Sequence, residues 1–213
     1  MSDLTENKFC ITIERGFGSG GKTVGVMLAE RLGVEYYDRD LSRLSSEYSG
    51  IDERLFVQFD NNVRSRLFRK YSPADLEAIL SPDDVNFVSD DNLFRLQARV
   101  IANLAEHENC IIIGRCSGFV LTGKPNILRL YIHAPLDKCT ANVQEHYGLS
   151  AEEARRMVIK ADANRRKYYN YYTGGLDWSD SANYDLSINT AELTFEQAAD
   201  MVLAALKVRG MVK

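Results

Sequence analysis

Residues 16–23, with the sequence GFGSGGKT, constrain the fold of this chain more than any other feature. They fit the pattern G-x-x-x-x-G-K-[ST], in which glycines let backbone N–H groups turn inward around a phosphate. An apolar strand is predicted directly before the loop, over residues 9–13, and an amphipathic helix directly after it, over residues 22–32. Strand, loop and helix in this order are the setting that the pattern requires, so the sequence predicts a phosphate site at the amino end of the helix.

Each residue type in the loop suits one part of a nucleoside triphosphate. The backbone of the loop is expected to surround the phosphates, the ammonium group of Lys22 to reach the outer phosphates, and the hydroxyl of Thr23 to bind Mg²⁺. The residues predicted to hold the phosphates are Gly16, Gly18, Ser19, Gly20, Gly21, Lys22 and Thr23. The alternative is a glycine-rich turn before a helix, which leaves the Gly-Lys-Thr ending unexplained.

Short apolar runs and helical patterns alternate along the rest of the chain. Further strands are predicted over residues 34–37, 110–113, 127–133 and 184–188. A helix is predicted over residues 93–105 because Leu93, Leu96, Val100 and Leu104 recur at three- and four-residue spacing. Alternating strands and helices predict an α/β protein with a parallel sheet covered on both faces.

Two segments depart from this alternation. Residues 50–90 contain no clear strand, and Ser72-Pro73 and Ser81-Pro82 mark turns that could start short helices, so a helical insertion between the second and third strands is predicted. Residues 150–172 are predicted to form a long charged helix, with Ser150 and Glu153 as a capping box and Thr173-Gly174-Gly175 as its end.

Composition limits the class of protein and its surroundings. A formal net charge of −4 argues against a protein that coats nucleic acid or an anionic membrane. The four cysteines lack metal-site spacing and are expected to be buried free thiols, and no apolar run is long enough to span a membrane. With no secretory signal pattern at its start, the chain is expected to be a cytoplasmic protein with neither nucleic-acid nor membrane partners.

Two charged residues follow predicted strands at the edge where open α/β folds bind ligands. Arg115 comes after the apolar run 110–113 and a glycine, and it is a candidate phosphate clamp or, alternatively, a surface arginine paired with a carboxylate. Asp38 follows the strand 34–37, where a carboxylate either caps the next helix or orients a ligand near the phosphate loop.

The charged helix at residues 150–172 carries the remaining candidates. At about 100° per residue, Arg155, Asp162 and Arg166 share one sector, Arg156, Lys160 and Lys167 share another, and Arg165 lies between Asp162 and the back of the helix. Such residues usually form a solvated face. As a group they could instead close over a triphosphate and stabilise the charge on a phosphoryl group in transfer.

Taken together, these stretches resemble the cytidylate kinase-like family of P-loop nucleoside monophosphate kinases. The resemblance covers nearly the whole chain, least of all the 50–90 segment. The chain departs from the family pattern at three places. Residues 37–40 (YDRD) differ from the family's usual sequence, and residues 160–165 carry fewer charged side chains. Many members of the family also resemble one another in having an arginine where this chain has Lys22. The matching stretches are 11–13 with 16–21 (ITI and GFGSGG), 36–38 (YYD), 113–116 (IGRC), 132–135 (IHAP), 168–174 (YYNYYTG) and 183–190 (NYDLSINT).

The resemblance implies a single P-loop kinase domain over residues 1–213, a three-layer sandwich with a five-stranded parallel sheet. It implies a helical insertion for the acceptor nucleotide over residues 39–90 and a lid over residues 150–183. ATP would bind the 16–23 loop, and Arg115 would hold the acceptor phosphate. The charged lid residues Lys160, Asp162 and Arg165 would complete the site, together with Arg166 if that arginine points inward.

The function expected on these grounds is transfer of the γ-phosphoryl group of ATP, with Mg²⁺, to a nucleoside monophosphate. CMP or dCMP is the first candidate. The catalytic residues would be Lys22, Arg115, Asp162, Arg165 and Arg166, with Asp38, Arg115 and Lys160 binding the acceptor. Two alternatives stay open: a kinase for another small metabolite, and a nucleotide-binding regulator without turnover. A GTPase-like switch is disfavoured, since the chain lacks an N-K-x-D motif.

Overall fold

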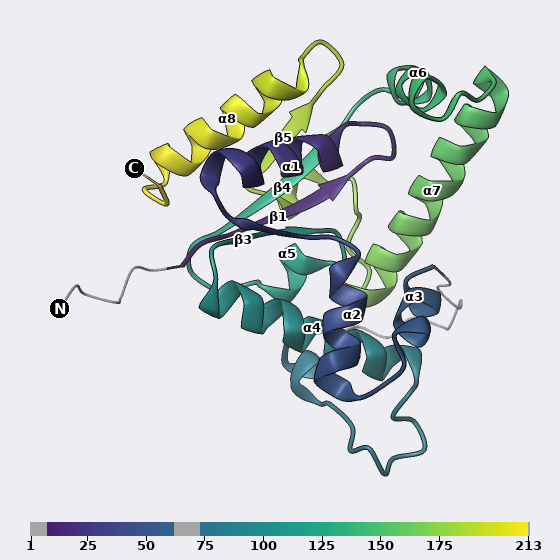
Figure 1. The fold of residues 1–213 in the computed structure, drawn as a ribbon, viewed down its shortest axis with the longest axis vertical. Coiled ribbons are helices and arrows are strands. Elements are labelled where there is room, and N and C mark those ends of the chain that lie inside the picture. Colours follow the sequence, from purple (N-terminus) through teal and green to yellow (C-terminus); the bar gives the residue numbers. More distant parts are fainter. Residues whose placement is uncertain (1–7, 62–72, 213) are drawn as a thin grey trace.

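The computed structural model describes residues 8–61 and 73–212, which form a three-layer α/β fold (Figure 1). One parallel sheet runs through it in the order β2-β3-β1-β4-β5, so the predicted five-stranded parallel sheet is confirmed. The strands are β1 (Cys10–Arg15), β2 (Glu35–Tyr37), β3 (Cys110–Ile113), β4 (Ile127–His133) and β5 (Leu186–Asn189).

Both faces of the sheet are buried, which explains why β3 is apolar at every position and β4 at five of its seven positions. On one face, Ile11 and Ile13 pack against helices α1 (Gly21–Leu32) and α8 (Phe195–Val208). On the other face lie α4 (Asp90–His107) and the short α5 (Ser117–Val120), as Figure 1 shows.

The segment between β2 and α4 is helical, with no strand among its described residues. It contains α2 (Asp40–Ser49), α3 (Glu53–Asn61) and the 3₁₀ turn η1 (Pro73–Glu77). Pro73 begins a helical turn as predicted, while Ser72 lies outside the described residues. At Ser81-Pro82 the chain forms turns without a helix. The next helix, α4, begins only after Ser89, whose side chain caps it.

The predicted charged helix is confirmed as α7 (Ala151–Tyr172), which packs against α6 (Leu136–Tyr147). Ser150 and Glu153 form the predicted capping box. Past the helix end, the Gly175 N–H donates a hydrogen bond to the Asn170 carbonyl at 2.8 Å. The long charged surface of this helix therefore begins and ends where its local sequence signals predicted.

The last strand is displaced from its prediction. Pairing with β4 begins at Leu186 rather than at Tyr184, because Tyr184 still belongs to the loop around η2 (Ser181–Asn183) and its hydroxyl donates to the Trp178 carbonyl at 2.7 Å.

All four cysteines are buried and free, as predicted. Among the described helices, none combines the length and apolar character that a membrane span needs.

Candidate functional site

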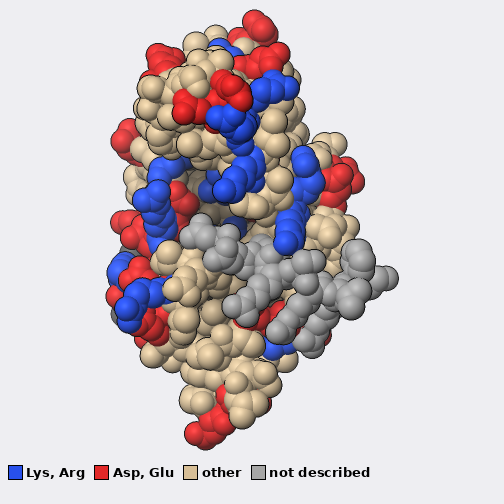
Figure 2. All heavy atoms as spheres, turned by 90° about the vertical axis from the view of Figure 1, so that its right-hand side faces the viewer, with Lys and Arg blue, Asp and Glu red and all other residues tan. Residues whose placement is uncertain are grey.

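A cavity of about 1390 Å³ lies where the strands end, between the phosphate loop, α3 and α7. Its walls include residues from the carboxyl ends of three neighbouring strands, namely Arg15 as the last residue of β1, Asp38 after β2 and Arg115 after β3. Figure 2 shows lysine and arginine side chains gathered around a hollow on the face that carries α7. The predicted ligand edge of the sheet is thus a positively charged cavity.

The phosphate loop leaves the amino end of α1 without a cap. Gly20 is the N-cap residue, with φ of 83°, and neither a side-chain cap nor an acidic residue occupies the first turn. The first N–H groups of a helix have no acceptor within the helix, and the helix dipole adds positive potential there. Gly20, Gly21, Lys22 and Thr23 all line the cavity. This end of the cavity therefore suits an anion such as a phosphate.

Gly18 has a left-handed backbone, with φ of +82°, and it lies against α6. A Cβ at this position would lie 2.5 Å from the Cys139 carbonyl oxygen and 2.9 Å from Val143. The loop can therefore keep its shape only with glycine at this position.

We expect Gly18→Ala to destabilise the fold by about 3 kcal/mol, because a backbone clash adds to the left-handed strain. The matched control is Gly33→Ala, since Gly33 also has a positive φ but has no neighbouring atom within 4 Å of the place a Cβ would take. That control should cost only about 1 kcal/mol. Urea unfolding of both variants measures the difference, and equal losses would contradict the role assigned to the Cys139 contact.

Ser19 braces the loop from within. Its hydroxyl donates to the carbonyl oxygens of Gly16, at 2.8 Å, and Ile132, at 2.9 Å, while its own carbonyl accepts from Thr190. Its side chain is fully buried. Ser19 was predicted to hold phosphate, and the structure places its hydroxyl in the support of the loop instead.

Lys22 and Asp38 meet at the mouth of the cavity. Lys22 Nζ lies 3.1 Å from Asp38 Oδ2, and Arg15 lies 3.8 Å from the other oxygen of the same carboxylate. Asp38 does not cap α2, whose N-cap is Arg39 without a side-chain cap bond. Of the two predicted roles for Asp38, the structure therefore favours the one beside the phosphate loop.

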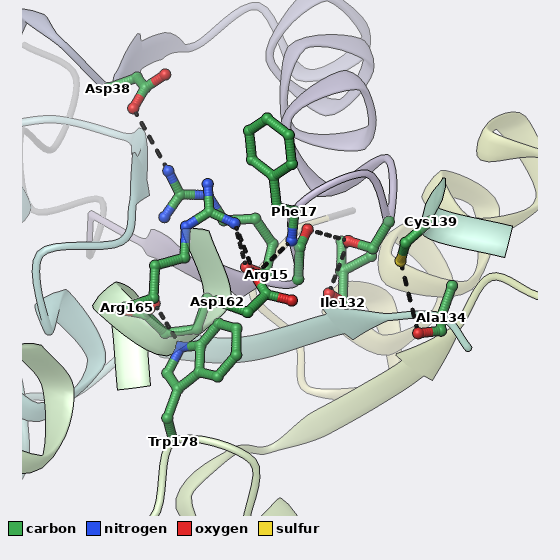
Figure 3. Close-up of polar contacts among 12 residues, drawn as sticks. Arg15, Phe17, Asp38, Ile132, Ala134, Cys139, Asp162, Arg165 and Trp178 are labelled. Carbon is green, nitrogen blue, oxygen red and sulfur yellow. Dashed lines mark hydrogen bonds and ion pairs between the residues drawn. The ribbon is translucent and has the colours of Figure 1, made fainter. Parts of the chain in front are cut away.

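Helix α7 reaches the phosphate loop through Asp162 and Arg165 (Figure 3). Asp162 accepts a hydrogen bond from the Phe17 N–H at 2.8 Å, and Arg165 Nη1 lies 3.3 Å from the same oxygen. Arg165 also donates to the Arg15 carbonyl at 3.1 Å. Burial, and then the nearby Arg15, lower the pKa of Arg165 to about 10, while burial raises the pKa of Asp162.

The other predicted lid residues take different positions. Lys160 lines the cavity, as does Lys167. Arg166 instead lies over the indole of Trp178, 6.0 Å from the ring centroid, and is not among the residues that line the cavity. Of the two arginines that the spacing left open, Arg165 is therefore the one that points inward.

Arg115 lies in a left-handed turn at the end of β3. Gly114, Arg115 and Cys116 all have positive φ, of 69°, 58° and 54°, which is rare for two successive residues with side chains. Arg115 Nη2 lies 2.7 Å from Asp60 Oδ2 on α3, and Ser42 donates to the same oxygen. The turn therefore aims Arg115 into the cavity and toward the helical insertion.

Asp60 is a carboxylate in a poor environment for charge. It is 3% exposed, and no hydrogen bond reaches its Oδ1 among the described residues. Burial raises the pKa of Asp60 from its ordinary value of 3.8 to about 6, although Arg115 and Ser42 act in the opposite direction. The carboxylate is thus held against Arg115 at a cost in stability.

The raised pKa of Asp60 predicts how the stability of the fold changes with pH. A carboxyl group whose pKa is raised by folding stabilises the fold fully below about pH 4, and this contribution is lost as the pH rises through about 6. The difference between 3.8 and about 6 corresponds to roughly 3 kcal/mol. Relative to Asp60→Asn, the natural chain should lose about that much stability between pH 4 and 7. Urea unfolding across this range checks it, and parallel curves would contradict it.

Several residues in and around the site were not predicted from the sequence, and Asp60, the partner of Arg115, is one of them. Arg15 lines the cavity beside Lys22, and Glu14, next to it, is 6% exposed and accepts a hydrogen bond from Trp178 Nε1 at 3.1 Å. Burial raises the pKa of Glu14. Two charged residues that end an apolar strand directly before the phosphate loop were a usable signal for Glu14 and Arg15. No comparable signal pointed to Trp178.

Comparisons with known proteins agree with this geometry. Residues 10–192 match the cytidylate kinase-like family. A cytidylate kinase of Pyrococcus abyssi (strain GE5 / Orsay) is 32% identical over 197 residues, covering 92% of each chain. A cytidylate kinase of Pyrococcus horikoshii is 28% identical over 204 residues, covering 95% of this chain and 91% of the relative.

The fold also has a close match in a solved structure. The crystal structure of an uncharacterized protein from Eubacterium ventriosum ATCC 27560 superposes with a TM-score of 0.69 at 25% identity, covering 94% of this chain and 99% of that one. The family match spans the phosphate loop, the Arg115 turn and α7 alike. The chain therefore belongs to the cytidylate kinase-like family, and it is a kinase of the nucleoside monophosphate kinase type.

Proposed function

We propose that this chain transfers the γ-phosphoryl group of ATP to a nucleoside monophosphate, with CMP or dCMP the first candidates. One observation carries the proposal: the phosphate loop and Arg115 line the same cavity, so two phosphate-binding ends face one space. The relatives named above are cytidylate kinases, which supports the choice of CMP.

ATP would lie with its phosphates on the uncapped amino end of α1. Lys22 would contact the outer phosphates, and Mg²⁺ would be held through Thr23, whose side chain is exposed in the first turn of the helix. Hydroxyl and carboxylate oxygens are the protein ligands that suit Mg²⁺, and the Asp38 carboxylate lies 3.1 Å from the ammonium group of Lys22, the neighbour of Thr23. The bound metal would neutralise charge on the β- and γ-phosphates.

The acceptor would lie at the other end of the cavity. A phosphate oxygen of the acceptor attacks the γ-phosphorus, the bond to the β,γ-bridging oxygen breaks, and ADP and a nucleoside diphosphate form. Arg115 would hold the acceptor phosphate, and Arg165 would stabilise the charge that spreads over the transferring group. Asp162 would fix Arg165, which it contacts at 3.3 Å. We propose residues 39–90 as the acceptor-binding insertion and residues 150–183 as the lid.

The phosphate groups of the substrates would compete with carboxylates of the protein for its lysine and arginine side chains. Lys22 is paired with Asp38, Arg115 with Asp60 and Arg165 with Asp162. A phosphate dianion carries more charge than a carboxylate and binds arginine through two hydrogen bonds, so substrate binding is expected to exchange these partners.

The test is ADP formation from ATP and Mg²⁺ with a panel of nucleoside monophosphates. Turnover that depends on CMP or dCMP, and is weak with AMP, GMP and UMP, would support the proposal. Turnover only with a small metabolite that is not a nucleotide would move the chain to the second candidate. ATP binding without acceptor-dependent ADP would make it a regulator.

A further inference from the structure

Arg15 occupies the space between the two phosphate-binding ends of the cavity. It ends β1, directly before the phosphate loop, and its guanidinium lies 3.8 Å from Asp38, the partner of Lys22. On its other side the guanidinium passes Gly114, where a Cβ would lie 2.4 Å from Arg15 Nη1. A chain of contacts thus runs from Lys22 through Asp38 and Arg15 to the turn that carries Arg115.

The surrounding backbone leaves room for this side chain. At the start of α1, a Cβ on Gly21 would lie 2.4 Å from the Arg15 Cβ, and Gly114 opposes the guanidinium as described. Gly114 has φ of +69°, a conformation that other residues adopt rarely. Because Gly21 and Gly114 lack a Cβ, the Arg15 side chain fits between the phosphate loop and the Arg115 turn.

Arg15 also has the longest ion pair among the described, partly buried arginines that line the cavity. Its ion pair with Asp38 is 3.8 Å long and shares that carboxylate with Lys22, which is closer at 3.1 Å. Arg165 lies 3.3 Å from its carboxylate partner Asp162, and its hydrogen bond to the Arg15 carbonyl holds it beside Arg15. The buried Glu14 also interacts electrostatically with Arg15 and Arg165, but burial raises its pKa and so weakens it as a counter-charge. Two arginines at close quarters, with ion pairs of 3.8 and 3.3 Å, therefore leave positive charge for a further anion.

We propose that Arg15 is a catalytic residue whose guanidinium contacts the phosphoryl group while it moves between donor and acceptor. This inference rests on the proposed function and adds a residue to it. Charge on the equatorial oxygens of the transferring group is what such catalysis must stabilise, and an arginine supplies several donors in a fixed plane. Arg15 is 18% exposed, so its contact with a phosphoryl group is shielded from bulk water.

The competing explanation is that Arg15 only holds Asp38 in place. The two explanations differ in a double-mutant cycle with Asp38→Asn. If Arg15 acts through Asp38, then Arg15→Met has no further effect once Asp38 is replaced. If Arg15 contacts the phosphoryl group, Arg15→Met still lowers the turnover number in that background.

The experiment measures the turnover number with the best nucleoside monophosphate and the Kd for a fluorescent ATP analogue with Mg²⁺. We expect Arg15→Met to lower kcat by about 10²- to 10³-fold and to change the Kd by less than fivefold. Arg15→Lys keeps the charge without the planar fork and should lose about tenfold. Arg31→Met is the matched control, because Arg31 is paired with Asp200 on the exposed α1–α8 surface, and it should behave as the natural chain.

Binding of fluorescent ADP with and without aluminium fluoride, a planar phosphoryl mimic, gives a second readout. The natural chain should bind ADP more tightly with the fluoride, and Arg15→Met should lose this gain. Near-normal kcat in Arg15→Met, or no further loss in the Asp38→Asn background, would overturn the role of Arg15 and leave the proposed function standing. A natural chain with neither acceptor-dependent turnover nor fluoride-dependent tightening would overturn both.

Discussion

Replacing Lys22 with methionine is expected to lower the turnover number for ADP formation about 10³-fold. The ammonium group is the only part of the side chain that carries charge, and methionine keeps most of its length and apolar stem. Loss of one well-placed donor to a transferring phosphoryl group typically reduces kcat by about 10²- to 10³-fold, and in the proposed mechanism Lys22 would also neutralise charge on ATP in the ground state.

The fold should survive this change. The Lys22 side chain is 61% exposed, and its pair with Asp38 is of the surface kind that contributes about 1 kcal/mol or less. Lys124→Met, in the exposed loop before β4, is the matched control and should retain full activity. Turnover within tenfold of the natural chain for Lys22→Met would remove the Lys22 ammonium group from the mechanism.

Replacing Arg115 with methionine is expected to lower kcat/KM for the acceptor nucleotide by about 100-fold. Two charge-assisted hydrogen bonds to one phosphate are worth roughly 3 kcal/mol, and tenfold in affinity corresponds to about 1.4 kcal/mol. The Kd for ATP should change by less than threefold, because the proposed function places Arg115 at the acceptor end of the cavity. Steady-state kinetics with the acceptor varied, and ATP binding measured separately, distinguish the two ends.

This variant also disturbs Asp60, which Arg115 contacts at 2.7 Å. Removing one partner of a buried pair is destabilising, and we expect a loss of about 2 kcal/mol, limited by protonation of Asp60. Arg115→Met with Asp60→Asn should recover that stability without recovering activity. If the double variant regains the kcat/KM of the natural chain, Arg115 serves the fold and not the acceptor.

The features that the sequence predicted well are those encoded over short distances. The phosphate loop, the Ser150 capping box and the Gly175 helix end each depend on residues within a few positions of one another, and all three take the predicted local structure. β3 and β4 have the predicted bounds because each is a compact apolar run buried on both faces. Strand boundaries without such signals were predicted less well, and β5 runs over residues 186–189 where 184–188 was predicted.

The composition of the cavity could not be predicted in the same way. Asp60 and Arg115 are far apart in the chain and meet only because α3 packs near the end of β3. Helical periodicity placed both Arg165 and Arg166 near the inner face of α7, and packing against Trp178 decided between them. Both outcomes depend on which elements pack against one another, and the residue pattern along one helix does not specify its neighbours.

By itself, the sequence predicted a phosphate site at the amino end of α1, because glycine conformations, helix dipole and the Gly-Lys-Thr ending are properties of consecutive residues. Only the tertiary structure decided which charges share the cavity with that loop. Parallel strands bring their carboxyl ends to one edge, and this edge is where Arg15, Asp38 and Arg115 meet. Arg15 gained its place from that convergence, since no spacing in the chain relates it to Gly114 or Asp38.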